Sequence, residues 1–169
     1  MTSEGFRRAV LDHKDRLHSY AVWMIHDREE ARDVTQESLV RLWQNRDRVD
    51  EPTARSWLLR TAHNLCVDRM RRRTVRSEVP ADTLETTLAD LGVDPERSAA
   101  SLGLRGAIAR ALTTLSARDR AIVLMREVHE MSYDEIASAL DLPIGTLKST
   151  LHRAREQLRR ELAGAGVLP

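Results

Sequence analysis

The chain has 169 residues, of which 41% are hydrophobic and 31% are charged, enough for one compact domain or two small ones. Its one cysteine, Cys66, excludes an internal disulfide and a cysteine-rich zinc site, which is typical of the reducing cytoplasm. The longest apolar run, 20–25, is far shorter than the ~20 residues that span a bilayer, and the amino terminus lacks an apolar signal core. We therefore expect a soluble cytoplasmic protein without membrane insertion.

Three helices are predicted in the first 73 residues, because apolar residues recur there at spacings of three, four and seven. They cover 6–24, about 29–45 and, after the helix breaker Pro52, about 54–73. The residues expected to face inward are Phe6, Val10, Leu17, Ala21, Met24, Ala31, Val34, Leu39, Leu42, Trp43, Leu58, Ala62 and Leu65. A single helix cannot bury such a stripe, so we expect a small bundle over 1–73.

Helical periodicity fades between 74 and 103. Pro80, Gly92 and Pro95 stand there among acidic residues, namely Glu78, Asp82, Glu85, Asp90, Asp94 and Glu96. This composition predicts a flexible acidic linker over 74–103 that separates the first domain from a second one over 104–169. The expected fold class is therefore all-α, with two small helical domains.

The second domain is predicted to contain a helix-turn-helix. Its apolar pattern starts at Leu104, and Ser116 with Asp119 is a capping signal for a helix that ends near 130. Ser132 with Glu135 opens a short helix over 133–140, which a turn with Pro143 separates from a long helix over about 145–162. The inner stripe of that long helix is Leu147, Leu151, Ala154, Leu158 and Leu162.

With this stripe inward, polar side chains remain near the outer surface of the long helix, namely Lys148, Ser149, Thr150, His152, Arg153 and Arg155. Arginine and lysine pair with guanine or phosphate, and short hydroxyls bond to either base edges or phosphates, so the set fits a DNA-recognition helix. A solvated basic helix in a bundle would show the same pattern, and the pattern alone does not decide between them.

A second basic segment, 55–76, has seven arginines against one acid, Asp68. Such a segment is attracted to a polyanion. Trp57 could stack on an exposed base, although a place in the core is the favoured interpretation for that residue. The polar stripe of Asp33, Gln36, Glu37 and Arg41 is, taken alone, an ordinary solvated face.

Catalytic and metal-binding signals are poor. The sequence has no glycine-rich phosphate loop, no nucleophile with an obvious base and no set of ligands at metal spacing. We expect no enzyme activity, no catalytic residue, no cofactor and no metal.

Two blocks of sequence resemble the extracytoplasmic-function (ECF) group of the sigma-70 family, the bacterial factors that lend promoter recognition to RNA polymerase. The first is DREEARDVTQESLVRLWQNRD followed by SWLLRTAHNLCVDRMRRR. The second is ALTTLSARDRAIVLMREVHEMSYDEIASALDLPIGTLKSTLHRAREQL. Together, in this order and on either side of an acidic linker, they cover nearly the whole chain.

The resemblance implies a role for each segment. The first domain would bind the β′ clamp helices of core RNA polymerase through Asp33, Gln36 and Glu37. It would recognise and melt the minus-10 element through Arg60, His63, Asn64, Arg69 and Arg71. The second domain would lie on the β flap and read the minus-35 element through the outer side chains of 148–155. The linker would run toward the RNA exit path, and an anti-sigma factor would hold the free protein.

One position departs from the family. Family members commonly carry arginine where this chain has Thr150, which implies a changed or weaker minus-35 contact. Two other functions compete with this interpretation. An autonomous helix-turn-helix regulator would bind a palindromic duplex as a dimer without polymerase. A helical adaptor that binds only proteins would leave both basic segments unexplained.

Overall fold

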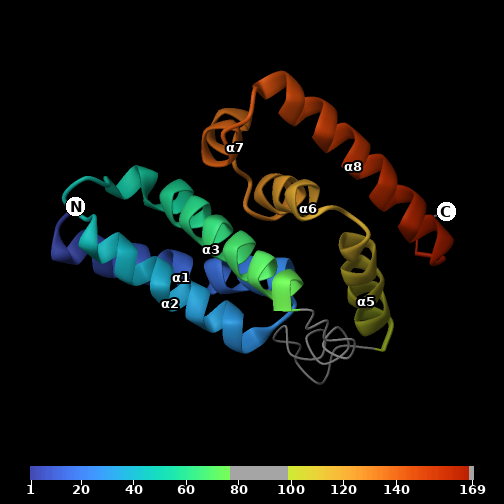
Figure 1. Cartoon of the computed structure of the whole chain (residues 1–169), viewed down its shortest axis with the longest axis horizontal. Helices are drawn as coiled ribbons and strands as arrows, with labels where there is room; N and C mark the ends of the chain where they lie inside the picture. Colours follow the sequence, from blue (N-terminus) through green and yellow to red (C-terminus); the bar gives the residue numbers. More distant parts are fainter. Residues whose placement is uncertain (77–98, 168–169) are drawn as a thin grey trace.

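The structure, a computed structural model, describes residues 1–76 and 99–167. Within these ranges all regular secondary structure is helical, which confirms the all-α prediction. Figure 1 shows two groups of helices, α1 to α3 from the first part of the chain and α5 to α8 from the second. We refer to them as the N-terminal and C-terminal units.

The N-terminal unit contains α1 (Ser3–Ile25), α2 (Arg28–Gln44), the short 3-10 helix η1 (Glu51–Thr53) and α3 (Ala54–Arg76). The turn between α1 and α2 is defined locally. His26 ends α1 in a left-handed conformation with φ 56°, and the Asp27 carboxylate accepts a hydrogen bond of 2.9 Å from the Glu30 amide. This tight turn lets α1 and α2 pack against each other, and α3 packs on both.

Most of the predicted inner residues of this unit are buried, namely Leu17, Ala21, Met24, Ala31, Val34, Leu42, Leu58, Ala62 and Leu65. The prediction was wrong for Trp43, whose exposed fraction is 40%. Thr35 and Ser38 are buried on α2 instead, and their hydroxyls donate hydrogen bonds of 2.7 Å to the carbonyls of the preceding turn. Because these bonds satisfy the hydroxyls, short polar residues can lie in the core where helices approach closely.

The C-terminal unit contains α5 (Ala99–Thr113), α6 (Ala117–Val123), one π-helical turn η2 (Leu124–Val128), α7 (Tyr133–Leu140) and α8 (Ile144–Gly164). The predicted helix-turn-helix is α7, the turn and α8. The Ser132 hydroxyl accepts from the Glu135 amide at 3.1 Å, and the Glu135 carboxylate accepts from the Ser132 amide at 2.7 Å, which confirms the capping box. Asp141, with φ 53°, ends α7, and Pro143 is the residue that precedes the first residue of α8.

The predicted linker differs from the structure at both ends. Helix α3 continues to Arg76, where the Thr74 hydroxyl donates back to the Met70 carbonyl at 3.1 Å. Helix α5 begins at Ala99, five residues before the first apolar residue of the predicted pattern. That residue, Leu104, is 45% exposed. The remainder of the predicted linker, 77–98, lies outside the described residues.

Both units contribute to one hydrophobic core. Buried residues of α1 and α3, such as Tyr20 and Leu58, belong to the same cluster as Met125 and Met131 of the C-terminal unit. Helix α3 packs against α7, and α1 packs against α6. In this conformation the two units are therefore in direct contact.

Candidate nucleic-acid and polymerase interfaces

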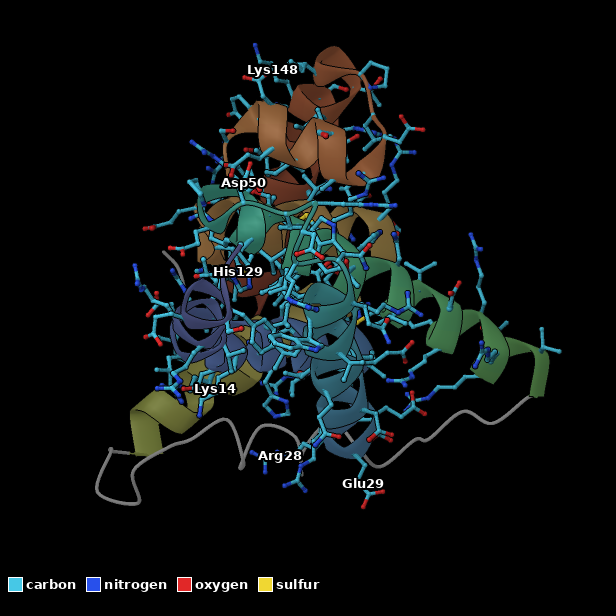
Figure 2. All side chains as sticks on the ribbon, turned by 90° about the vertical axis from the view of Figure 1, so that its left-hand side faces the viewer. Lys14, Arg28, Glu29, Asp50, His129 and Lys148 are labelled. Atoms are coloured by element: carbon cyan, nitrogen blue, oxygen red, sulfur yellow. The ribbon has the colours of Figure 1, made fainter. Side chains whose placement is uncertain are left out.

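Five of the six predicted DNA-binding residues are exposed on the outer surface of α8. They are Lys148, Ser149, His152 and Arg153, on the second and third turns of this helix, and Arg155, which follows them. Figure 2 shows Lys148 at one end of the molecule, while Arg28 and Glu29, at the start of α2, lie at the other. A positively charged helix face that projects from the body of the protein can enter a major groove.

Thr150 was predicted to be an outer residue, and this was wrong. Its exposed fraction is 3%, because Leu147, Leu151 and Ala154 define the buried stripe and position 150 falls inside it. The Thr150 hydroxyl accepts a hydrogen bond of 3.4 Å from the Arg153 guanidinium. Thr150 therefore faces the core of the unit. Its hydroxyl is linked to the outer surface by the hydrogen bond from Arg153.

Arg155 is engaged within the protein. Its guanidinium donates to one Glu127 carboxylate oxygen, from Nε at 2.9 Å and from Nη2 at 2.5 Å. This hydrogen bond raises the pKa of Arg155. The pair joins α8 to η2 within the C-terminal unit.

Tyr133, at the start of α7, lies between two cations. The guanidinium of Arg126 is 4.9 Å from the ring centroid and the Lys148 ammonium is 5.8 Å from it. Cations are attracted to the negative face of an aromatic ring. Tyr133 therefore contacts Lys148 of α8 as well as Arg126, which the sequence analysis did not predict.

The predicted minus-10 residues on α3 divide into two groups. Arg60, Asn64 and Arg71 are exposed, and none of them makes a side-chain hydrogen bond or ion pair with other described residues. They are available to a ligand on the outer face of α3. Arg69, in contrast, donates to the Glu30 carbonyl at 2.8 Å and lies 3.7 Å from the Glu37 carboxylate.

His63 is partly buried and shares a hydrogen bond of 3.1 Å with the Tyr20 hydroxyl through Nδ1. Burial lowers the pKa of His63 to about 4, so its ring is neutral at neutral pH. A neutral imidazole offers one donor and one acceptor rather than a charge, which suits contact with a base edge better than with a phosphate. Trp57 is partly buried against the core, in agreement with the favoured interpretation.

The predicted polymerase-binding residues lie on one face of α2. Asp33 and Gln36 are exposed, while the Glu37 carboxylate is paired with Arg41 at 2.5 Å and with Arg69 at 3.7 Å. Glu37 therefore also connects α2 to α3.

An exposed apolar surface adjoins this face and was not predicted. Val40 is 54% exposed and Trp43 is 40% exposed. The Trp43 ring contacts Phe6 edge-on, with centroids 4.9 Å apart, and the Arg46 guanidinium lies 4.1 Å from its centroid. The sequence did contain a signal for this surface. Val40 is three residues after Glu37, so helical periodicity places Val40 on the polar side of the helix.

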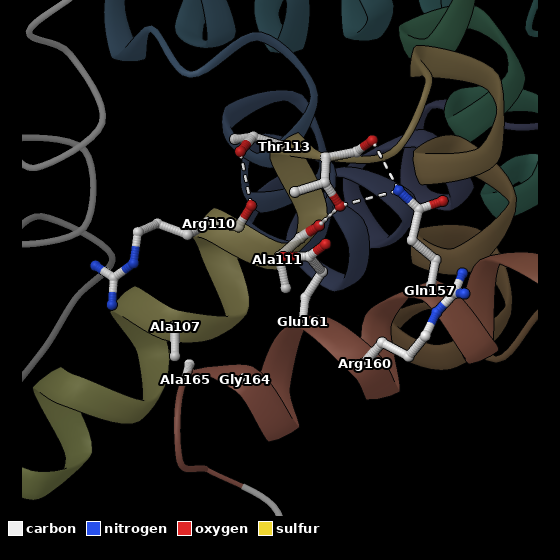
Figure 3. A pocket seen from close by; sticks show the side chains of 10 residues that line it. Ala107, Arg110, Ala111, Thr113, Gln157, Arg160, Glu161, Gly164 and Ala165 are labelled. Carbon is white, nitrogen blue, oxygen red and sulfur yellow. Dashed lines mark hydrogen bonds between the residues drawn. The ribbon is translucent and has the colours of Figure 1, made fainter.

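One groove among the described residues is lined mainly by polar side chains and is open to solvent. It has a volume of about 1040 Å³ and lies between α5 and the end of α8 (Figure 3). Gln157 crosses it and donates to the Thr114 carbonyl and hydroxyl at 3.0 and 3.2 Å. The charged residues that line it are Arg110, Arg160 and Glu161, and none of them is a nucleophile with a base.

Among the described residues, no group of three or more histidine, cysteine, aspartate or glutamate side chains could hold a metal ion. No described helix combines the length and apolar character needed to cross a bilayer.

Comparison with known proteins gives a consistent result over both units. Residues 9–76 match the family model described as Sigma-70 region 2, and residues 105–158 match Sigma-70, region 4. The chain is 30% identical to the ECF RNA polymerase sigma factor SigW of Bacillus subtilis, with coverage of 94% of this chain and 89% of SigW. It is 34% identical to the ECF RNA polymerase sigma factor SigL of Mycobacterium tuberculosis, with coverage of 95% and 90%.

The fold is also similar to that of solved structures. The sigma factor RpoE from Bartonella quintana, solved in complex with the anti-sigma factor NepR, superposes with a TM-score of 0.73 at 23% identity, over 94% of this chain and 96% of that one. CnrH, solved in complex with the cytosolic domain of CnrY, superposes with a TM-score of 0.69 at 22% identity, over 96% and 90%.

Proposed function

Because the chain belongs to the ECF group of the sigma-70 family of RNA polymerase sigma factors, we propose that each of its exposed surfaces performs one part of promoter recognition. In this proposal the polymerase catalyses RNA synthesis, and this chain supplies the promoter specificity. Both act in the cytoplasm. The observation that carries the proposal is that the two family matches fall on the two helical units that expose basic helix faces. We assign minus-10 recognition and polymerase binding to the N-terminal unit, predicted as 1–73, and minus-35 recognition to the C-terminal unit, predicted as 104–169. The residues between α3 and α5 would connect them.

The minus-35 surface is the outer face of α8. Lys148, Ser149, His152 and Arg153 are its direct contacts, because they are exposed on the first turns of a helix that projects from the unit. Thr150 acts behind this surface, where its hydroxyl accepts from Arg153, and it stands where the family commonly has arginine. Arg155 contacts DNA only after it exchanges Glu127 for a phosphate.

The minus-10 surface is the outer face of α3. Arg60 and Arg71 hold the phosphate backbone, and His63 and Asn64 contact an unpaired base, because neutral groups can read base edges while arginines neutralise phosphates. Extruding a base costs a few kcal/mol, so contacts with the open strand must outweigh the loss of stacking. Arg69 supports this helix through Glu30 and Glu37.

The polymerase surface is the outer face of α2. Asp33, Gln36 and Glu37 supply polar contacts to the β′ clamp helices, and the exposed Val40 and Trp43 supply apolar area beside them. Such a combination is typical of a protein interface with an apolar centre and a polar rim. The C-terminal unit would lie on the β flap. Since RpoE was solved in complex with the anti-sigma factor NepR, we also propose an anti-sigma factor for this chain.

Run-off transcription tests the function directly. Core RNA polymerase is incubated with a pool of promoter fragments, with and without this protein, and the transcripts are sequenced. We expect specific transcripts only when the protein is present. A folded sample that neither binds polymerase nor yields transcripts would refute the proposal, and a tight, sequence-specific gel shift by the protein alone would favour the autonomous regulator.

A further inference from the structure

Arg155 lies on the same side of α8 as two of the proposed minus-35 contacts. Lys148, His152 and Arg155 follow one another at spacings of four and three residues, so helical periodicity places them along one line of the helix. All three side chains are exposed. DNA that contacts the first two residues of this line therefore comes close to Arg155.

Three cations meet at Tyr133, beside this line. The Arg126 guanidinium is 4.9 Å and the Lys148 ammonium 5.8 Å from the centroid of its ring. Arg155 is the third, since its pKa is raised first by its hydrogen bond to Glu127 and also by Tyr133. Among the described residues, neither Arg126 nor Lys148 pairs with a carboxylate. The cluster therefore has an excess of positive charge, which attracts a polyanion.

Glu127 of η2 neutralises one of these cations, but in an arrangement that a better acceptor can replace. Both bonds from Arg155, at 2.9 Å from Nε and at 2.5 Å from Nη2, end on the same carboxylate oxygen, Oε1. A guanidinium binds more strongly when its two bonds run in parallel to two oxygens of a carboxylate or phosphate. Both side chains are 45% exposed, and exposed ion pairs contribute little to stability. A DNA phosphate can therefore displace Glu127 at small cost.

We propose that Glu127 is a built-in competitor for DNA phosphate, which holds Arg155 in the free protein and yields it to the DNA backbone beside the minus-35 element. This inference rests on the proposed function, in which Arg155 exchanges Glu127 for a phosphate, and adds the effect of that exchange on affinity. Phosphates are the same in every sequence, so the competition weakens binding to DNA of any sequence. Glu127 thus limits the time that the protein spends on DNA outside promoters.

The competition changes the salt dependence of binding. A side-chain cation that contacts one phosphate releases counterions from DNA, so the logarithm of the binding constant falls with the logarithm of the salt concentration with a slope of about −0.9. When Arg155 leaves Glu127, the freed carboxylate attracts a cation from solution, which offsets this release. Removal of the charge at position 127 ends the offset. The slope should then become steeper by about 0.9.

The test variant is Glu127→Gln, which keeps the size of the side chain and removes its charge. The matched control is Glu161→Gln, the same change at an exposed residue near the other end of α8. Each full-length protein is combined with core polymerase, and thermal unfolding shows that each variant is folded. Fluorescence anisotropy then measures binding to a duplex that carries the minus-35 element and ends before the minus-10 element, over a range of salt concentrations. A duplex with a scrambled minus-35 element is measured in parallel.

We expect Glu127→Gln to bind both duplexes about fivefold more tightly than the control at low salt, because an exposed ion pair no longer has to be broken. We also expect its steeper salt slope. In the double variant Glu127→Gln with Arg155→Gln the gain should disappear, because the side chain that contacts the phosphate is then neutral.

Equal affinities of Glu127→Gln and the control would overturn the inference. A gain that persists in the double variant would mean that Glu127 only repels DNA, and a gain confined to the intact element would mean that Arg155 contacts a base. Either result would also overturn the exchange with a phosphate. If the wild-type complex shows no preference for the intact element, minus-35 recognition itself, and with it the proposed function, fails.

Discussion

At the scale of single residues, burial separates side chains that the sequence places together. Thr150 and Arg153 are three positions apart on α8, yet the first is 3% exposed and the second lies on the outer surface. The sequence could predict which face of α8 is exposed and basic, because the leucine spacing defines an inner stripe. It could not assign Thr150, because a threonine next to that stripe fits either side and only packing decides.

Arg153 is the residue on which minus-35 recognition should depend most. If its guanidinium makes a bidentate contact with a base, Arg153→Ala should weaken binding to the preferred element by about 1 to 3 kcal/mol and relax selectivity at one position. Arg159→Ala, on the same helix but paired with Glu156, is the matched control. Transcription from a library randomised at the minus-35 element measures both, and an unchanged preference would exclude Arg153 from the reading set.

His129 should make stability depend on pH. Its burial, reinforced by Arg16 and Arg55, lowers its pKa from 6.5 to about 4. Between these pH values the unfolded chain binds a proton that the folded chain does not. The free energy of unfolding is therefore highest above about pH 6.5 and decreases as the pH falls toward 4. His129→Phe removes this contribution, and its buried Nε2 has no partner to lose.

We therefore expect His129→Phe to reduce the loss of stability between about pH 7.5 and pH 5 by about 1 to 2 kcal/mol. Urea unfolding of wild type and variant at both pH values measures this difference. Equal losses in the two proteins would show that His129 does not carry the effect. His26 and His63, whose pKa values burial also lowers to about 4, contribute in the same direction and are unchanged in both proteins.

At the scale of elements, local signals predicted the helices well. The capping box of Ser132 and Glu135 lies within four residues, so the sequence contains all of it, and the start of α7 was predicted correctly. The π-helical turn η2 has no such signal. Its backbone is defined by the His129 amide, which donates to the Leu124 carbonyl at 3.1 Å, and by the contact of η2 with the N-terminal unit, for instance the bond of 3.4 Å from Arg16 to the Val128 carbonyl.

The capping box should contribute measurably to stability. Ser132→Ala removes the acceptor of the Glu135 amide and should lower the free energy of unfolding by about 1 kcal/mol. Ser138→Ala, at an exposed position within α7, is the control and should change it by less than about 0.5 kcal/mol. Thermal unfolding compares the two, and equal stabilities would mean that Arg55 and Ser56, which both donate to Glu135, hold the start of α7 without the cap.

At the scale of the whole molecule, the contact between the units could not be predicted from the sequence. The Arg120 guanidinium donates to the Met24 carbonyl at 3.0 Å, yet the two residues are 96 positions apart, and neither residue type signals the other. An arginine among apolar residues is usually exposed, so no pattern predicts one that is 6% exposed. The two units were predicted from local periodicity, whereas their packing depends on which helix ends meet in space.

Assembly with polymerase should depend on the outer face of α2. Asp33→Arg reverses a charge on an exposed side chain and should reduce the affinity for core polymerase by at least about tenfold, while the thermal unfolding of the protein is unchanged. Asp12→Arg, an equal change on the exposed side of α1, is the control. Co-purification with core polymerase compares them. Retained binding by Asp33→Arg would show that the interface lies elsewhere.

The separation of Arg120 from Met24 along the chain also has a consequence for synthesis on the ribosome. The carbonyl that accepts from Arg120 is made 96 residues before its donor. At about 5 to 20 residues per second, translation takes about 5 to 20 s to cover that separation. Every nascent chain thus passes through a stage in which α1, α2 and α3 can fold before the C-terminal unit has been made. At that stage the surface that later contacts the C-terminal unit, including Tyr20, is exposed. A partner that binds co-translationally would meet the N-terminal unit in its uncovered form.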